Sequence, residues 1–407
     1  MKVILSHVAR HHALETAFAL QSAGWLKQFY TSFYDEKNPP VKHRLLRTLI
    51  PKPLLSKVSN RYREGLDESK ITSFYFPELL ERTPMRRFIG RYNMMNLKGE
   101  LFDRRVAIQN LECDIFHGFE GAVLHSMRRA KQQGAITILD QPIFHYLAIR
   151  EILVEEYQKF QIEVPSFLKG RDINIRRKEK EIEEADFILV PTERIVQDFV
   201  QRGKPKERIK CVQYGFNARR FFPGNKQDNI FRILFVGIVG IRKGVYYLLE
   251  AFKQLNLKNS ELVLVSPVDE EFKPILHRYE GLFKHIHSLP NSEMSELFQN
   301  ASIFVFPSLA EGSSLSTFEA MASGLPVIVS ENAGSITRDG KDGFVVPIRD
   351  IEALKQKILL LYENEVLRRE MGESAADYVK QFTWENYHKN IQRIYQEIIS
   401  NNFKQSF

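Results

Sequence analysis

The feature that most constrains the fold is a regular alternation of short apolar runs with helix-length segments. Nine runs rich in Val, Ile, Leu and Phe each precede a turn and a helical pattern. Strands that alternate with helices predict parallel sheets, and nearly continuous apolar strands indicate sheets covered on both faces. The predicted strands are Val3–Ser6, Ile115–His117, Ile136–Leu139 and Phe187–Val190 in the first half, and Ile233–Val236, Leu262–Val265, Ile303–Phe306, Val327–Val329 and Phe344–Val346 in the second.

The runs fall into two sets, separated by a stretch rich in Gly, Pro and charged residues at 201–229, which we interpret as a linker. A chain of 407 residues favours two domains, since domains are commonly about 100–200 residues long. We therefore expect an α/β protein with two doubly wound domains that face each other across a cleft. The predicted helices of the second set include Val245–Leu255, Met294–Ala301, Thr317–Ser323 and Ile351–Glu363.

Composition and simple patterns exclude several classes of protein. The two cysteines, Cys113 and Cys211, lie in no Cys/His cluster, which argues against a disulfide scaffold and a structural zinc and fits a reducing cytosol. No apolar run approaches the ~20 residues of a membrane span, and polar residues directly after Met1–Ser6 leave no signal-peptide core. Neither half has the GxGxxG fingerprint of a dinucleotide-dependent oxidoreductase.

The formal net charge of +8 predicts an anionic partner, which the charge alone leaves open between nucleic acid, lipid headgroups and a phosphorylated substrate. No nucleic-acid-binding signature is present, so we expect no nucleic acid partner.

The strongest motif is the polar loop and short helix after the predicted strand Ile303–Phe306. Glu311 lies in this loop, and Glu319 lies one to two turns into the helix. In open α/β sheets, ligands bind beyond the carboxyl ends of strands, and a helix N-terminus binds anions. Two carboxylates around such an anion site suit a nucleotide sugar, which carries both phosphates and hydroxyls. The backbone N–H groups expected to converge there are those of Gly312, Ser313, Ser314 and Leu315.

A second motif, Arg242-Lys243-Gly244, follows the predicted strand Ile233–Val236. The next helix starts here, so both cations oppose the helix dipole, at about 0.3–1 kcal/mol each when exposed. A bound diphosphate would turn this conflict into a shared anion clamp. The alternative is a solvated pair of cations at a helix start.

The spacing Glu311-x7-Glu319 resembles the signature of glycosyltransferase family 4, among the retaining glycosyltransferases of the GT-B fold. The similarity continues through Glu319–Ile328, Asn332–Ser335 and Asp342–Pro347 and extends back to Phe235–Gly244. It is specific over about 185–400. The resemblance implies two Rossmann-like domains, with an N-terminal acceptor-binding domain at 1–215 and a C-terminal donor-binding domain at 216–383. It also implies that a last helix, within 384–407, packs back on the first domain.

By this resemblance, Glu311 contacts the donor sugar or its leaving phosphate, Glu319 the ribose hydroxyls, and the Ser313–Leu315 backbone the sugar and diphosphate. The family has a Gly-Arg-x4-Lys pattern on the diphosphate, in which Lys243 matches while Ile238 stands in the place of the arginine. Arg242 is the candidate substitute. The resemblance implies no metal and no cofactor.

Many relatives carry a histidine after the strand that corresponds to Ile136–Leu139, where this chain has Asp140. We expect Asp140 to stabilise positive charge at the anomeric centre or to hold an acceptor hydroxyl. His145 is the rival candidate, or else a satisfied, partly buried histidine. His117, His7 and His11 are weaker candidates for the wall of the cleft. A metal chelated by the last two is disfavoured, because no carboxylate motif supports it.

A stretch at 41–65 interleaves leucines with seven bases. It predicts either a surface resting on anionic membrane or an ordinary solvated face. The bases are Lys42, Arg44, Arg47, Lys52, Lys57, Arg61 and Arg63.

Together these features predict a retaining, metal-independent glycosyltransferase. It would move a hexosyl group from a UDP- or GDP-sugar to a hydroxyl of a sugar or lipid-linked acceptor, in surface polysaccharide or glycolipid synthesis. We expect a cytoplasmic protein, with the inner face of the membrane as a further location. The alternative is a non-catalytic GT-B protein that binds nucleotide or glycan, or a scaffold at a membrane. The absence of the arginine at Ile238 and of paired glycines near His11 favours it.

Overall fold

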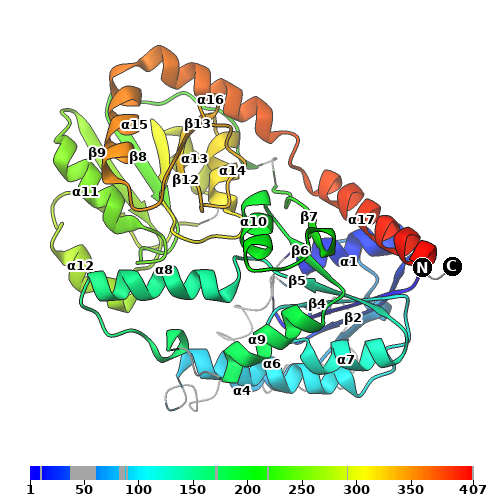
Figure 1. Ribbon diagram of the computed structural model, residues 1–407. Helices are drawn as coiled ribbons and strands as arrows, with labels where there is room; N and C mark the ends of the chain where they lie inside the picture. The colour runs from blue at the N-terminus through cyan, green and yellow to red at the C-terminus, as the bar shows by residue number, and fades with distance from the viewer. Residues whose placement is uncertain are drawn as a thin grey trace.

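The chain forms two parallel β-sheets, each with helices on both sides (Figure 1). A computed structural model describes residues 1–9, 12–36, 61–81, 88, 90–169, 173–217, 220–290 and 292–405. Within these ranges, no helix combines the length and the apolar character that crossing a bilayer requires.

The first sheet has seven parallel strands in the order β3-β2-β1-β4-β5-β6-β7. The chain starts in the middle, winds outward to β3, and then returns to continue on the other side of β1. The point of reversal therefore lies between β1 and β4, which pair directly. Its strands are β1 (Val3–His7), β2 (Leu26–Thr31), β3 (Ile71–Ser73), β4 (Ile115–Phe119), β5 (Ile136–Asp140), β6 (Phe187–Val190) and β7 (Ile209–Cys211).

The second sheet repeats this winding with six parallel strands in the order β10-β9-β8-β11-β12-β13. Its reversal lies between β8 and β11, where Ile233 pairs with Ile303. Doubly wound sheets bind ligands at such a reversal, outside the carboxyl ends of the strands. Its strands are β8 (Phe231–Val236), β9 (Ser260–Val265), β10 (Lys284–Ile286), β11 (Ile303–Phe306), β12 (Val327–Ser330) and β13 (Gly343–Val346).

Helices form the outer layers of both domains. Those in the first half are α1 (Ala13–Ser22), α4 (Tyr75–Glu81), α6 (Arg91–Ala107), α7 (Leu124–Gln132), α8 (Tyr146–Lys159), α9 (Ile173–Glu184) and α10 (Glu193–Gln201). Those in the second half are α11 (Val245–Leu255), α12 (Lys273–His277), α13 (Met294–Gln299), α14 (Leu315–Ala322), α15 (Ile351–Glu363), α16 (Glu365–Val379) and α17 (Trp384–Gln405).

Each face of the first sheet packs into its own core, because successive side chains of a strand point to opposite faces. On β1, Val3 and Leu5 join the core that includes residues of α1 and α17, whereas Ile4 joins the core that includes residues of α6, α7 and α9. All three side chains are fully buried. This double burial explains why the strands are apolar throughout instead of alternating with polar residues.

Two helices pack against the sheet that the other half of the chain forms. α17 follows the second domain but lies beside α1, as Figure 1 shows in red and blue. Its Ile391 and Tyr395 are fully buried in the first-domain core. Conversely, Leu153 and Tyr157 of α8 belong to the core of the second domain. The two domains thus exchange one helix each.

The sequence pattern predicted nine strands, and all nine are confirmed, with ends that move by at most two residues. Four strands were missed. Three of them, β3, β7 and β10, are three-residue pieces, and β2 carries Lys27 and Gln28 between its apolar positions. The predicted linker at 201–229 is wrong at its start, because β7 lies inside it as the last strand of the first sheet.

The docking of α17 predicts a large effect of Ile391→Ala on stability. Ile391 is fully buried, so the change should lower the free energy of unfolding by about 2–5 kcal/mol. Arg393→Ala on the exposed face of the same helix is the control and should change it by less than about 0.5 kcal/mol. Urea unfolding followed by circular dichroism measures both. Equal effects of the two changes would contradict the packing of α17 in the core.

Candidate functional site

The candidate donor site lies where the second sheet reverses its winding. The loop after β8 carries Arg242 and Lys243, and the loop after the neighbouring strand β11 carries Glu311. The two loops are bonded to each other, because the Leu309 N–H donates to the Arg242 carbonyl at 2.9 Å. Gly244 allows this close approach, since a Cβ there would lie 2.1 Å from the Pro307 carbonyl oxygen. The fold therefore delivers both motifs to one place.

Glu311 holds both cations of the second motif. Its Oε2 accepts a hydrogen bond from Arg242 at 3.0 Å and pairs with the Lys243 ammonium. Arg242 also donates to the Ala310 carbonyl at 2.8 Å. Burial lowers the pKa of Lys243, and the neighbouring Arg242 lowers it further, against the opposing effect of Glu311. Two cations so close together form a site that a phosphate group can share with, or take over from, the carboxylate.

The start of α14 offers fewer free amides than the sequence predicted. The Ser314 N–H donates to the Gly334 carbonyl at 3.2 Å, so it is used within the protein. The Glu311 N–H likewise donates to the Asn332 carbonyl at 2.9 Å. Within the described ranges, the N–H groups of Gly312, Ser313 and Leu315 have no backbone or side-chain acceptor. The expected anion site thus contains these three groups without Ser314.

Glu319 lies half-buried on α14, and its carboxylate has no hydrogen bond to any described residue. Burial raises the pKa of its carboxyl to about 7, and the charge of Arg220 opposes this only in part. Arg220 belongs to the connection between the two domains, and Phe318 contacts the same connection through Phe216, with ring centroids 5.8 Å apart. A carboxylate in this state has unused acceptor capacity, which hydroxyl groups of a ligand would fill.

The donor loops touch the carboxyl edge of the first sheet. A Cβ on Gly312 would lie 1.6 Å from the carbonyl oxygen of Pro142, which follows β5. Arg194, at the start of α10, donates to the Asn332 side chain at 2.9 Å. The two sequence-distant edges therefore meet at the candidate site, as Figure 1 also indicates for α10 and the second domain.

Sequence reasoning missed two polar side chains at this junction, those of Gln141 and Thr192. Both side-chain amide atoms of Gln141 and the hydroxyl of Thr192 are buried without a partner among the described residues, as is the hydroxyl of Ser313, which the sequence did predict for the donor site. Gln141 precedes Pro142, and Thr192 precedes the α10 helix of Arg194. An unpaired buried polar group costs about 1–3 kcal/mol, which a ligand that bonds to it would relieve. Only burial marks these residues, and a sequence does not display burial.

Asp140 lies beneath this surface and contacts histidines. Asp140 is 1% exposed, and its carboxylate forms a hydrogen bond with His12 at 2.8 Å and lies 3.3 Å from the Nε2 of His117. Burial by itself would raise the pKa of Asp140, but the two histidines hold it well below its usual range. Its expected contact with the sugar stays a prediction. His12 was not among the predicted site residues, although it stands in the same cluster of histidines after β1.

The other histidine candidates are also mostly internal. His117 is fully buried, and its Nδ1 lies 2.5 Å from the Tyr395 hydroxyl of α17. His145 caps α8, where its Nδ1 accepts from the Leu147 N–H at 3.2 Å, and burial lowers its pKa to about 4. This is the satisfied histidine that the sequence left as an alternative. His7 is buried at the end of β1, and His11 lies outside the described residues.

The remaining predictions concern the basic stretch at 41–65, Ile238 in the place of the family's arginine, and metals. Residues 41–60 lie outside the described residues. The next two bases form ion pairs within the protein. Arg61 pairs with Glu78 at 3.1 Å, and Arg63 pairs with Glu15 at 2.8 Å. Ile238 is 44% exposed. In the part of the chain that the structure describes, no group of three or more His, Cys, Asp or Glu side chains is placed to hold a metal ion.

In a comparison with known protein families, part of the second half of the chain matches a family model. Residues 230–364 match the family model for group 1 glycosyl transferases. Over this segment the chain is similar to group 1 glycosyl transferases. The matched segment contains β8 to β13 and all the candidate donor residues. The similarity thus coincides with the doubly wound second sheet.

Curated relatives extend this similarity over about half the chain. An uncharacterised glycosyltransferase of Methanocaldococcus jannaschii is 30% identical over 198 residues, which is 47% of this chain and 55% of the relative. A Campylobacter jejuni N,N'-diacetylbacillosaminyl-diphospho-undecaprenol alpha-1,3-N-acetylgalactosaminyltransferase is 29% identical over 223 residues, which is 50% of this chain and 58% of the relative. The chain spans little more than half the length of these relatives.

Solved structures match nearly the whole chain and show the GT-B fold, which confirms the predicted architecture. Sucrose-phosphate synthase from Thermosynechococcus elongatus has a TM-score of 0.63 at 19% identity, over 98% of this chain and all of the other. Anabaena HepE in complex with UDP-glucose has a TM-score of 0.62 at 14% identity, over 98% and 100%.

The raised pKa of Glu319 predicts that Glu319→Gln stabilises the protein at pH 8. The folded-state pKa of about 7 exceeds the usual 4.5, so the ionised carboxylate destabilises the fold above pH 7. This penalty shrinks as the pH falls from 7 towards 4.5, because the folded protein takes up the proton. We expect Gln to raise the free energy of unfolding by roughly 1–3 kcal/mol at pH 8 and to have little effect near pH 4.5.

Urea unfolding across this pH range makes the measurement. Glu363→Gln, on the exposed face of α15, is the control and should change little at any pH. A gain that is the same at both ends of the range would show that the burial of charge at Glu319 is not the cause.

Proposed function

We propose that the chain is a retaining glycosyltransferase. In this proposal it moves a hexosyl group from a UDP- or GDP-sugar to an acceptor hydroxyl, without a metal. The observation that carries the proposal is the cluster in which Glu311 holds Arg242 and Lys243 beside the start of α14. It places two cations and unpaired amides at the reversal point of a sheet, where a diphosphate finds complementary charge.

In the proposed complex, the diphosphate lies between Lys243, Arg242 and the amides of Gly312, Ser313 and Leu315. The ribose hydroxyls meet Glu319, whose carboxylate lacks other donors among the described residues. The phosphates take over part of the pairing of Glu311 with Arg242 and Lys243. The Glu311 carboxylate can then accept a hydrogen bond from a hydroxyl of the donor sugar. This assignment gives each charged group a partner of opposite charge or a hydroxyl, which is the requirement for buried polar groups.

The reaction follows from this placement. The bond between the anomeric carbon and the diphosphate oxygen breaks, and negative charge grows on the diphosphate. Lys243, Arg242 and the helix start stabilise that charge. The leaving diphosphate takes the proton of the acceptor hydroxyl, and the acceptor oxygen bonds to the anomeric carbon on the same face. The protein acts by positioning and by charge stabilisation, so no metal enters the proposal.

The acceptor is proposed to be a sugar or a lipid-linked sugar of a surface polysaccharide or glycolipid, handled at the cytoplasmic face of a membrane. In support, the Campylobacter relative is named for a diphospho-undecaprenol acceptor. A phosphatidyl-myo-inositol mannosyltransferase of Mycobacterium leprae is 28% identical over 171 residues. For the donor, the HepE structure holds UDP-glucose, which supports a UDP-sugar ahead of a GDP-sugar.

A second candidate function is nucleotide or glycan binding without transfer. The exposed Ile238 favours it, because the family's diphosphate arginine is missing from that position. Arg242 argues against this candidate function, because it pairs with Glu311 and supplies a guanidinium to the same cluster. Slow release of UDP or GDP from candidate donor sugars separates the two, because a non-catalytic protein leaves the donors intact.

The proposed site predicts that two substitutions affect different parts of a nucleotide. Lys243→Ala should weaken binding of both UDP (or GDP) and inorganic pyrophosphate, because it removes a charge-assisted contact with phosphate. Glu319→Ala should weaken binding of the nucleoside diphosphate alone, because it removes the ribose contact. Each loss should be roughly 10- to 100-fold. Isothermal titration calorimetry measures both ligands with both variants. If Glu319→Ala weakened pyrophosphate as much as UDP, the ribose assignment would be wrong.

The reaction predicts a larger effect of Lys243→Ala on transfer than on binding. Loss of a group that stabilises charge in the transition state should lower kcat by on the order of 100- to 1000-fold. Lys253→Ala, an exposed lysine near the other end of α11, is the matched control and should leave transfer unchanged. Release of nucleoside diphosphate in the presence of acceptor gives the rate. Full activity of Lys243→Ala with the true donor would refute the assignment.

A further inference from the structure

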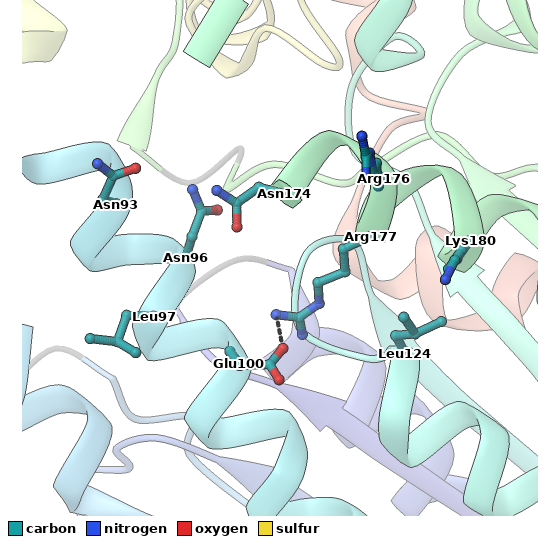
Figure 2. A pocket seen from close by; sticks show the side chains of 9 residues that line it. All are labelled: Asn93, Asn96, Leu97, Glu100, Leu124, Asn174, Arg176, Arg177 and Lys180. Atoms are coloured by element: carbon teal, nitrogen blue, oxygen red, sulfur yellow. Dashed lines mark ion pairs between the residues drawn. The ribbon is translucent and has the colours of Figure 1, made fainter. Parts of the chain in front are cut away.

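A pocket lies in the first domain, between α6, α7 and α9. Its volume is about 630 Å³. Figure 2 shows side chains of α6 and α9 facing each other across it, with Asn96 and Asn174 on opposite walls. None of its lining residues belongs to the donor site described above, and the proposed function has not used them.

The pocket opens at the carboxyl edge of the first sheet, the edge that faces the donor loops. α6 leads into β4 and α9 leads into β6, so the N-terminal halves of both helices lie at the ends where these strands finish. Contacts agree with this placement. Lys178 of α9 pairs with Glu120, just after β4, at 2.8 Å. Glu181 accepts the N–H groups of Gly121 and Val123 at 2.6 and 3.1 Å.

Two of the three cations that line the pocket have no acidic partner among the described residues. Arg177 is neutralised by Glu100 at 2.9 Å and Asp103 at 3.2 Å, as the dashed line in Figure 2 marks for the first pair. Arg176 and Lys180, four residues apart on α9, are exposed and have no ion pair within 4 Å among the described residues. Two unneutralised cations at the rim of one pocket favour an anionic ligand.

The wall of the pocket is mainly apolar. Leu97 and Leu124 line it, together with the methylene stems of the basic side chains. A polar residue, Asn96, also lines it, and its buried Nδ2 has no acceptor among the described residues. A free phosphate would use the cations and the amide but would leave the apolar wall exposed. A ligand with both a phosphate and a hydrocarbon part covers all three features.

We propose that this pocket binds a phosphate ester carried on a hydrocarbon chain, a lipid phosphate. Arg176, Lys180 and Asn96 bind the phosphate, and Leu97 and Leu124 contact the first part of the chain. That this lipid carries the acceptor hydroxyl rests on the proposed glycosyltransferase function, whereas its binding does not. The pocket then holds the acceptor at the edge of the first sheet that the donor loops touch.

The test measures binding in the absence of any donor sugar. Full-length protein is sedimented with phosphatidylcholine vesicles that contain a polyprenyl phosphate, and with vesicles that contain an equal charge of phosphatidylserine. We expect tighter binding to the polyprenyl phosphate. Arg176→Ala with Lys180→Ala should weaken it by roughly 10- to 100-fold. Asn96→Asp, which keeps the side-chain volume but places a negative charge beside the phosphate, should weaken it as well.

The matched control is Lys389→Ala with Arg393→Ala, an exposed pair with the same spacing on α17, which packs on the other face of the sheet. This pair should bind like the wild type. Equal losses in both double variants, or equal binding to both vesicles, would reduce the effect to net charge and overturn the proposal. Full competition by inorganic phosphate or glucose 1-phosphate would also overturn it, since the ligand would then be a soluble phosphate ester.

Thermal unfolding checks that each variant folds. UDP and GDP binding by the pocket variants should stay at the wild-type level. Lost lipid binding with intact nucleotide binding supports the pocket even where transfer is never observed. Conversely, inactive donor-site variants that still bind the lipid would support the pocket assignment. Failure of the lipid-binding proposal can therefore be distinguished from failure of the glycosyltransferase proposal.

Discussion

The site depends on one ion cluster, in which a single carboxylate, Glu311, holds two cations delivered by a neighbouring strand. Neither Arg242 nor Lys243 is stable at the start of a helix by itself, because the helix dipole repels positive charge there. Glu311 resolves this conflict in the protein alone, and a diphosphate resolves it in the proposed complex. The doubly wound order makes the cluster possible, because it places β8 and β11 side by side at the reversal, where the loops that follow them meet.

Several groups around this cluster are in states that reduce stability. The pKa of Lys243 is lowered and that of Glu319 is raised to about 7, in each case chiefly by burial. The amide of Gln141 has no partner among the described residues. Each departure opposes folding by itself, and in the proposed complex each is relieved by a different part of a nucleotide sugar or its acceptor. Their gathering at one junction is therefore better explained by ligand binding than by packing.

The fold and the donor motifs were predictable because their signals are local. Apolar runs, the Glu311 and Glu319 spacing and the Arg242-Lys243 pair are all visible in short stretches of sequence. What failed depends on distant packing. The Ser314 amide is used by Gly334, twenty residues away. Gln141 gives no sequence signal at all, because a glutamine becomes informative only once its burial is known.

The exchange of helices between the domains sets how the two ligand sites are related. α8 leaves the first domain to pack on the second, where its buried Glu156 bonds to Arg349 at 2.6 Å and to Tyr247 at 2.8 Å. α17 returns to the first domain, where Tyr395 reaches His117 and, through it, Asp140.

Breaking a buried pair such as Glu156 with Arg349 leaves an uncompensated charge, so the α8 attachment resists separation. The contacts of Asp140, His117 and Tyr395 attach α17 to the first domain, because Asp140 is the last residue of β5, next to Gln141. Each domain is thus anchored through a helix of its neighbour, and the contact of Gly312 with Pro142 lies between these two anchors. Because the pocket on α6 and α9 opens at the same edge as Pro142, this arrangement places the proposed acceptor-side surface opposite the donor loops.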